Sequence, residues 1–135
     1  WAQRGRRLDP PRSLGGGAEG AARGHGLLVD VTDGECGPGC GQTLGILRQI
    51  RLAQGREMYR VRTALLLNRQ STAYVGQDVA ALHADADVLR GLQLTPGTVL
   101  IVDPLGNAVL AYAASFAPTG VIEDLRRLLR LSQVG

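Results

Sequence analysis

Apolar runs along the chain predict an α/β domain over residues 27–135. Short continuous runs indicate strands at residues 27–31, 61–67, 98–102 and 108–112, with a shorter extended piece at 79–84. Apolar residues at helical spacing indicate helices at 41–55, around 85–92, and from Thr119, the expected N-cap, to Arg130. The first strands need a parallel crossover and the last two form a hairpin, so the pattern predicts a mixed central sheet with flanking helices.

Residues 1–26 differ from the rest of the chain and are expected to form a flexible tether rich in glycine, arginine and proline. Arg4, Arg6 and Arg7 precede an Asp-Pro-Pro sequence, and three consecutive glycines follow at 15–17. Glycine at this density loses so much backbone entropy on folding that order is costly. The alternative is an arm that packs on the domain through Trp1, Leu8 and Leu14.

Composition limits both the core and the partners. Apolar residues make up 44% of the chain but aromatic residues only 4%, so the core must be aliphatic. All 15 basic residues are arginine and the net charge is +3, yet no basic run is interleaved with aromatic residues. A base-stacking surface needs that interleaving, so we do not expect nucleic-acid binding. No stretch approaches the ~20 apolar residues that span a bilayer.

The two cysteines, Cys36 and Cys40, lie in a Cys-Gly-Pro-Gly-Cys loop between the strand at 27–31 and the next helix. A bridge across so short a loop stabilises little, which favours redox or metal chemistry over a structural staple. Pro38 suits a first helical turn, so the helix N-terminus should favour a thiolate at Cys36, with Cys40 as the resolving partner. Gly37 and Gly39, which lie between the two cysteines, make the loop pliable enough for the sulfurs to form a disulfide or to bind the soft ion Cu(I) together.

The histidines are weaker candidates for a third metal ligand. His25 precedes the first strand and the cysteines follow it, so at ~3.3 Å per residue they lie more than about 10 Å apart. His83 lies near a short helix, where a surface position is the ordinary interpretation. Neither has a second ligand nearby in the sequence.

Segments 30–40, 47–56 and 102–107 resemble membrane-anchored thioredoxin-like proteins of proteobacteria, which are related to the Sco/SenC family of cytochrome c oxidase assembly factors. The element order is also that of thioredoxin. The resemblance implies a thioredoxin-like fold, a periplasm-facing domain at the inner membrane, and an N-terminal membrane anchor ahead of residue 1. It also implies a role near copper delivery to the oxidase or reduction of its cysteines.

The resemblance assigns further site residues. In thioredoxin folds a cis-proline faces the cysteines, and Pro96 is the candidate, the alternative being a trans proline in an ordinary loop. In Sco proteins Cys36 and Cys40 would be two copper ligands. The third would be a histidine shortly before the strand that leads into the Asp-Pro turn, and residues 94–98 contain none.

The leading hypothesis is therefore an envelope thiol–disulfide oxidoreductase with Cys36, Cys40 and Pro96 at its catalytic site and no required cofactor. Its partners would be protein thiols or disulfides, with a cytochrome oxidase subunit as one candidate. Two alternatives stay open. One is a Sco-type Cu(I) metallochaperone with an incomplete site at Cys36 and Cys40, and the other is a redox-inert interaction domain.

Overall fold

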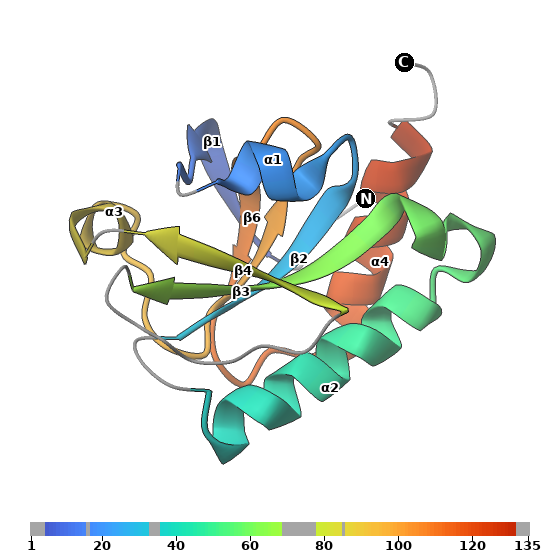
Figure 1. Ribbon diagram of the computed structural model, residues 1–135. Coiled ribbons are helices and arrows are strands. Elements are labelled where there is room, and N and C mark those ends of the chain that lie inside the picture. The colour runs from blue at the N-terminus through green and yellow to red at the C-terminus, as the bar shows by residue number, and fades with distance from the viewer. Residues whose placement is uncertain (1–4, 16, 33–35, 69–77, 85, 132–135) are drawn as a thin grey trace.

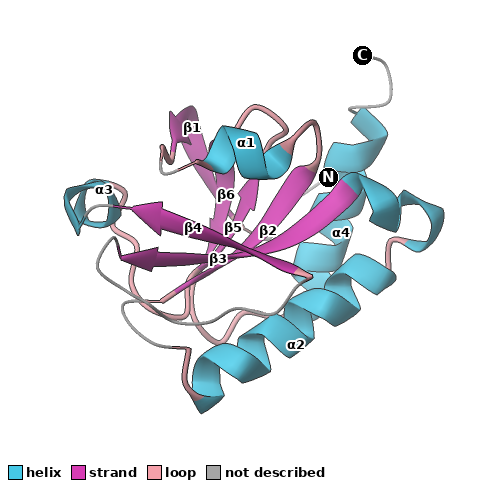
Figure 2. Ribbon diagram, viewed as in Figure 1, coloured by secondary structure: helices cyan, strands magenta, loops and turns pink. Residues whose placement is uncertain are grey.

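A computed structural model describes residues 5–15, 17–32, 36–68, 78–84 and 86–131 of the chain. The strands and helices predicted after residue 26 are present, with boundaries that shift by a few residues (Figure 2). The elements, in chain order, are β1 (Arg6–Ser13), α1 (Ala18–Ala22), β2 (Gly26–Val31), α2 (Pro38–Leu52), the 3₁₀ helix η1 (Gly55–Arg60), β3 (Val61–Asn68), β4 (Val79–Ala84), α3 (Ala86–Gly91), β5 (Val99–Val102), β6 (Asn107–Tyr112) and α4 (Pro118–Leu131).

The strands form one six-stranded sheet in the order β1-β6-β5-β2-β3-β4 (Figure 1). β2, β3 and β4 are parallel, whereas β5 pairs antiparallel with β2. β6 and β1 extend the antiparallel half. A parallel pair needs a long crossover, which α2 and η1 supply between β2 and β3, while β5 and β6 are joined directly as a hairpin. The mixed sheet predicted from the sequence is confirmed.

Alternation along the strands divides the core into two layers. Leu27, Val29 and Val31 lie in the layer covered by α1 and α3, whereas Leu28 lies in the layer covered by α2 and α4 (Figure 1). Asp30 follows the same alternation. Its antiparallel neighbour Val99 belongs to the α2 and α4 layer, and directly opposed residues share a face of a sheet. β2 therefore places a carboxyl group in the layer that holds the cysteine helix.

The N-terminal segment expected to be a tether is folded from residue 5 to residue 15 and again in α1. β1 pairs antiparallel with β6, and Leu8 and Leu14 are buried in the α1 and α3 layer. The alternative expectation, an arm that packs on the domain, therefore describes Leu8 and Leu14. Trp1, the third residue of that expectation, lies outside the described residues. The tether prediction counted only local backbone entropy. Pairing with β6 and burial of aliphatic surface, worth about 25 cal/mol per Å², offset that cost.

Helix starts differ slightly from the prediction. α2 begins at Pro38, because a proline at the first helical position loses no hydrogen bond. α4 begins at Pro118, so Thr119 lies inside its first turn and is not the N-cap. Within the described part of the chain, no helix has both the length and the apolar character needed to cross a bilayer.

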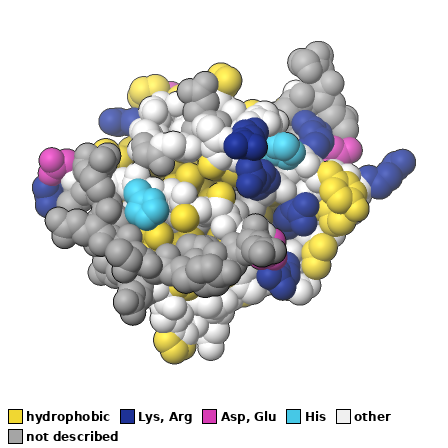
Figure 3. Space-filling view, viewed as in Figure 1, with side chains coloured by type: hydrophobic (Ala, Val, Ile, Leu, Met, Phe, Trp, Pro, Cys, Tyr) yellow, Lys and Arg dark blue, Asp and Glu magenta, His cyan; other side chains and the backbone are white. Residues whose placement is uncertain are grey.

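Ion pairs contribute little to this fold. Arg48 pairs with Asp78 at 2.8 Å and Arg60 with Glu57 at 2.7 Å, and all four side chains are at least one third exposed. Exposed pairs contribute about 0–1 kcal/mol each. On the face shown in Figure 3, arginine side chains lie in several small groups separated by neutral and apolar surface. The aliphatic layers on both sides of the sheet therefore account for most of the stability.

Candidate dithiol site

Cys36 and Cys40 are joined in a disulfide, with their Cα atoms 5.0 Å apart. That separation lies within the range a disulfide requires. Cys36 lies just before the N-cap residue Gly37, and Cys40 is the third residue of α2. Both cysteines are half-buried. The three-residue loop thus brings the two sulfurs together at the start of a helix, in the positions predicted from Pro38.

The N-terminus of α2 carries no compensating negative charge among its own residues. Gly37 offers no side chain for a capping hydrogen bond, and the first turn contains no acidic residue. The first backbone N–H groups of a helix have no partner within the helix and give its start a partial positive charge. This charge favours a thiolate over a thiol at Cys36.

Asp30, near the end of β2, is a buried acid that the sequence pattern does not single out. Its side chain is 1% exposed, and Oδ2 has no hydrogen-bond partner among the residues that the structure describes. Burial raises the pKa of this carboxyl from 3.8 to about 7. A buried acid that titrates near neutrality is typical of proton-transfer sites. The available signal was a single charge inside the otherwise apolar run at 27–31.

The cis bond expected at Pro96 is absent, because the cis peptide bond among the described residues is Asp9–Pro10. Thr98 N–H donates to the Thr95 carbonyl at 3.1 Å, and Gly97 has φ 90°. A type II turn has these features, with a trans proline at its second position and glycine at its third. Pro96 is exposed and occupies the second position of this turn.

The turn at residues 95–98 is fixed beside the end of β2. Gly97 N–H donates to the Val31 carbonyl at 2.9 Å, and Val31 N–H donates to the Thr98 carbonyl at 2.9 Å. Since β2 ends at Val31 and the chain then enters the cysteine loop, the turn lies at the edge of the sheet from which that loop leaves. A role for Pro96 in shaping this face stays a prediction.

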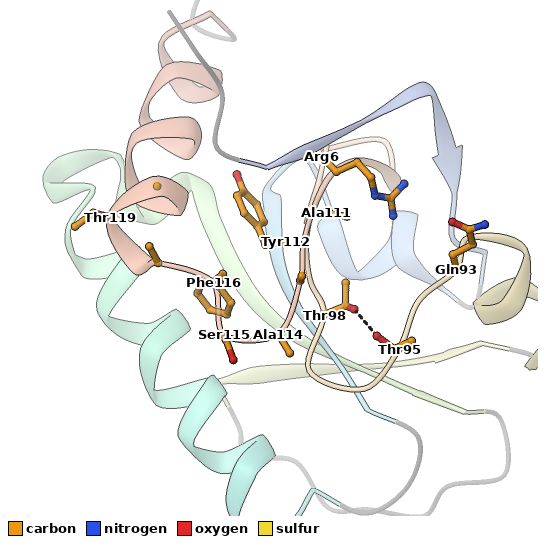
Figure 4. A pocket seen from close by; sticks show the side chains of 13 residues that line it. Arg6, Gln93, Thr95, Thr98, Ala111, Tyr112, Ala114, Ser115, Phe116 and Thr119 are labelled. Carbon is orange, nitrogen blue, oxygen red and sulfur yellow. Dashed lines mark hydrogen bonds between the residues drawn. The ribbon is translucent and has the colours of Figure 1, made fainter.

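A cavity of about 820 Å³ opens from this turn toward the start of α4 (Figure 4). Thr95 and Thr98 form one wall, and their hydroxyls are 3.3 Å apart. Tyr112 and Phe116, whose ring centres are 6.4 Å apart, form another. Arg6 and Gln93 lie at the far end. The cavity therefore combines aromatic surface, hydroxyl groups and one cation, and its threonine wall belongs to the turn beside the end of β2.

The histidines are not brought to the cysteines. His83 lies on β4, the outermost strand, with β3 between it and β2. The Nδ1 atom of His25 is 3.1 Å from the Ala22 carbonyl, at the opposite end of β2 from the cysteine loop. Among the described residues, no three His, Cys, Asp or Glu side chains converge on a position that could hold a metal ion. Within that part of the chain, no histidine or acidic side chain joins the disulfide-bonded cysteines as a third ligand.

A mixed sheet with a dithiol at the start of its first crossover helix defines the thioredoxin-like class, and the comparisons with solved structures agree. The chain belongs to the family described as the transmembrane-like, thioredoxin-like, C-terminal domain, whose model matches residues 27–132. No curated protein matches this sequence. The thioredoxin-like fold expected from the sequence is therefore confirmed.

Three solved structures illustrate the likeness. Copper-bound ScoI of Arabidopsis thaliana has a TM-score of 0.62 and 10% identity, covering 84% of this chain and 89% of that one. Copper-bound ScoI of Bradyrhizobium japonicum has a TM-score of 0.53 and 15% identity, covering 81% and 88%. A DsbF homologue from Corynebacterium diphtheriae has a TM-score of 0.56 and 10% identity, covering 91% and 90%. At these identities the likeness concerns the fold alone.

Proposed function

We propose that this chain is a thiol–disulfide oxidoreductase of the bacterial envelope that acts on cysteines of a partner protein. The observation that carries the proposal is the Cys36–Cys40 disulfide at the uncapped N-terminus of α2. The buried carboxyl of Asp30, in the layer covered by α2, supports it. So does the likeness in fold to a DsbF homologue.

The exchange proceeds through a mixed disulfide. In the reducing direction, the Cys36 thiolate attacks one sulfur of a partner disulfide, and the other partner sulfur leaves as a thiolate that takes up a proton. The Cys40 thiolate then attacks the Cys36 sulfur, and the first partner sulfur leaves and is protonated in turn. Two electrons pass from the dithiol to the partner, and the Cys36–Cys40 disulfide forms. The reverse sequence oxidises a partner dithiol.

Asp30 is proposed to handle the proton of the resolving thiol. Cys40 must lose its proton before it can attack, and a carboxylate with a pKa of about 7 accepts a proton at neutral pH and releases it again. Asp30 lies at the end of β2, on the face covered by α2, and Cys40 lies in the first turn of that helix. The acid and the resolving thiol thus belong to the same layer of the fold.

Serine variants of the two cysteines test the reaction. The full chain, reduced, is mixed with a peptide disulfide and the products are followed by mass spectrometry. We expect Cys36→Ser to abolish exchange and Cys40→Ser to accumulate the mixed disulfide, because the resolving step is lost. The double serine variant, compared by circular dichroism, controls for folding. Exchange by Cys36→Ser at the wild-type rate would rule out this mechanism.

We also propose that the domain faces the periplasm at the inner membrane and that its partner belongs to cytochrome oxidase. The family description and the likeness in fold to Sco proteins support this placement. The test uses the whole gene product in its native host. Labelling Cys36→Ser, whose Cys40 is then a free thiol, with a membrane-impermeant maleimide should succeed in intact cells. Labelling only after lysis would contradict the placement.

Cu(I) cargo is a second candidate, favoured by the copper-bound Sco structures that share the fold. The reduced thiols of Cys36 and Cys40 would supply two soft ligands, which suit Cu(I). Competition of the reduced protein with a coloured Cu(I) chelator measures this binding directly. Copper retained by the wild type and lost by Cys36→Ser would support the cargo role.

If double serine variants keep full biological function, the domain is instead a redox-inert interaction module.

A further inference from the structure

A second cavity continues the first along β1. It has a volume of about 280 Å³ and is lined by Arg6, Arg7 and Arg12 of β1 on one side and by residues 91–93 on the other. Arg6 and Gln93 line both cavities, so the two cavities are adjacent at these side chains. Figure 4 shows Arg6 and Gln93 at the end of the first cavity that is farther from Thr119. We call the two adjacent cavities together the β1 groove.

The β1 groove is lined by arginine side chains that are not neutralised by the fold. The guanidinium groups of Arg6, Arg7 and Arg12 make no hydrogen bond or ion pair with any residue that the structure describes, whereas the backbone of all three pairs with β6. The carboxyl group of Asp9 also lines the groove, which leaves two positive charges in excess. Most of the other arginines that the structure describes are engaged with the fold itself, Arg56 and Arg130 being exceptions. Arg51, for example, donates to the Val61 carbonyl at 2.7 Å, and Arg90, next to the groove, pairs with Asp87.

The groove links this charge to the dithiol edge of the sheet. Its near end is formed by Thr95 and Thr98, in the turn that is hydrogen-bonded to Val31, the last residue of the strand that precedes the two cysteines. Its far end is formed by Arg12. A small anion would need only the arginine end. An extended polypeptide can occupy the whole length, with its cysteine near the dithiol and its charged side chains against β1.

We propose that the β1 groove binds an acidic extended segment of the redox partner, so that Arg6 and Arg12 select substrates with carboxylates several residues from the reacting cysteine. This inference rests on the proposed thiol–disulfide exchange and names its substrate class. Guanidinium groups bind carboxylates through paired hydrogen bonds. Complementary charge around a docking site also raises the rate of productive encounter.

Two matched peptides and two matched double variants test the proposal. One disulfide peptide carries a run of glutamates away from its cysteine, and the other carries glutamines at the same positions. The Arg6→Gln/Arg12→Gln variant removes the groove charge. Arg56→Gln/Arg130→Gln removes the same charge from two exposed arginines outside the groove. Exchange rates are compared at low salt and at about 1 M salt, where the Debye length falls to about 3 Å.

We expect wild type and Arg56→Gln/Arg130→Gln to prefer the acidic peptide by roughly 3- to 10-fold at low salt, the effect of two exposed ion pairs. The preference should disappear in Arg6→Gln/Arg12→Gln and at high salt. Equal rates for both peptides in the wild type would overturn the groove proposal and leave the exchange reaction standing.

A binding measurement separates the two proposals. A fluorescent, cysteine-free acidic peptide is titrated into the double serine variant Cys36→Ser/Cys40→Ser, and anisotropy reports binding without any exchange. Binding that is lost when Arg6→Gln/Arg12→Gln is added supports the groove even if the reaction fails. Absence of binding, or equally strong binding of a labelled peptide with glutamines at the same positions, overturns it.

Discussion

The hydroxyl of Tyr112 donates a 2.7 Å hydrogen bond to Oδ2 of Asp124, and Gly5 N–H donates to the same oxygen at 3.0 Å. Tyr112 ends β6, Asp124 is fully buried on α4, and Gly5 directly precedes β1. One carboxylate oxygen therefore joins three elements. It holds the start of β1 against the layer that also contains the cysteine helix.

We expect Tyr112→Phe to lower the free energy of unfolding by about 1–3 kcal/mol, because a buried carboxylate loses a donor. Burial and Asp124 raise the pKa of the Tyr112 hydroxyl well above its ordinary value, so this donor stays protonated across the pH range of the measurement. Urea denaturation gives the free energy. Tyr59→Phe is the control, since Tyr59 is 69% exposed and should be nearly neutral.

Gly5→Ala should destabilise the fold by about 1–3 kcal/mol through overpacking. A Cβ atom at Gly5 would lie 2.7 Å from Cε1 and Cζ of the Tyr112 ring, so the ring or the start of β1 must shift. Gly45→Ala is the matched control. It lies within α2 with nothing within 4 Å of its Cβ position, and alanine should add about 0.5–1 kcal/mol there. Thermal melts compare the two, and equal shifts would contradict the packing explanation.

Asp30→Asn should change how stability depends on pH. The folded-state pKa of Asp30 is raised to about 7 from 3.8, so between about pH 4 and pH 7 the folded state keeps a proton that the unfolded state has lost. Stability of the wild type therefore falls as pH rises through that window and levels off above it. We expect Asp30→Asn to be more stable than wild type by roughly 2–4 kcal/mol at pH 8 and similar to it at pH 4.

Urea denaturation of both oxidised proteins at a series of pH values measures the difference. A difference that stays constant from pH 4 to pH 8 would show that Asp30 does not titrate with a raised pKa. The same variant should also slow the resolving step of exchange at neutral pH. In that case the mixed disulfide with a partner peptide accumulates, as expected for a lost proton acceptor.

Reduction of the Cys36–Cys40 disulfide should leave the protein folded. The bridge closes a loop of only a few residues, for which the chain-entropy contribution is about 2 kcal/mol. The two aliphatic layers do not depend on it. Circular dichroism melts with and without reductant should show a modest drop in midpoint and a cooperative transition in both states. Loss of cooperativity on reduction would mean that the bridge is structural.

The sequence was sufficient for the elements that carry their own local signal. The run at 27–31 predicted β2, and Pro38 between the two cysteines indicated a first helical turn there, although the helix itself was expected only from residue 41. The turn around Pro96 could also have been predicted, because proline followed by glycine is typical of a type II turn. Expecting a cis bond there transferred a family feature to a sequence that encodes a different turn.

The remaining features depend on contacts between distant segments. β1 contains three arginines and two prolines, and only pairing with β6 explains its extended conformation. Asp30 is an ordinary polar residue in the sequence. Its unusual pKa arises because β2 is central and packed on both faces. The β1 groove needs both β1 and the loop after α3, which are about eighty residues apart, so no local pattern indicates it.

The position of β1 has a practical consequence for choosing the residue at which an expressed fragment of this domain begins. The family model starts at residue 27, but the sheet starts at Arg6. A fragment starting at residue 27 would leave the outer edge of β6 with unpaired N–H and C=O groups, and it would uncover the aliphatic surface that Leu8 and Leu14 protect. Such an edge is a template for pairing with another copy of the chain. Fragments that lack β1 should therefore self-associate, and their redox behaviour would describe an aggregate instead of the folded domain.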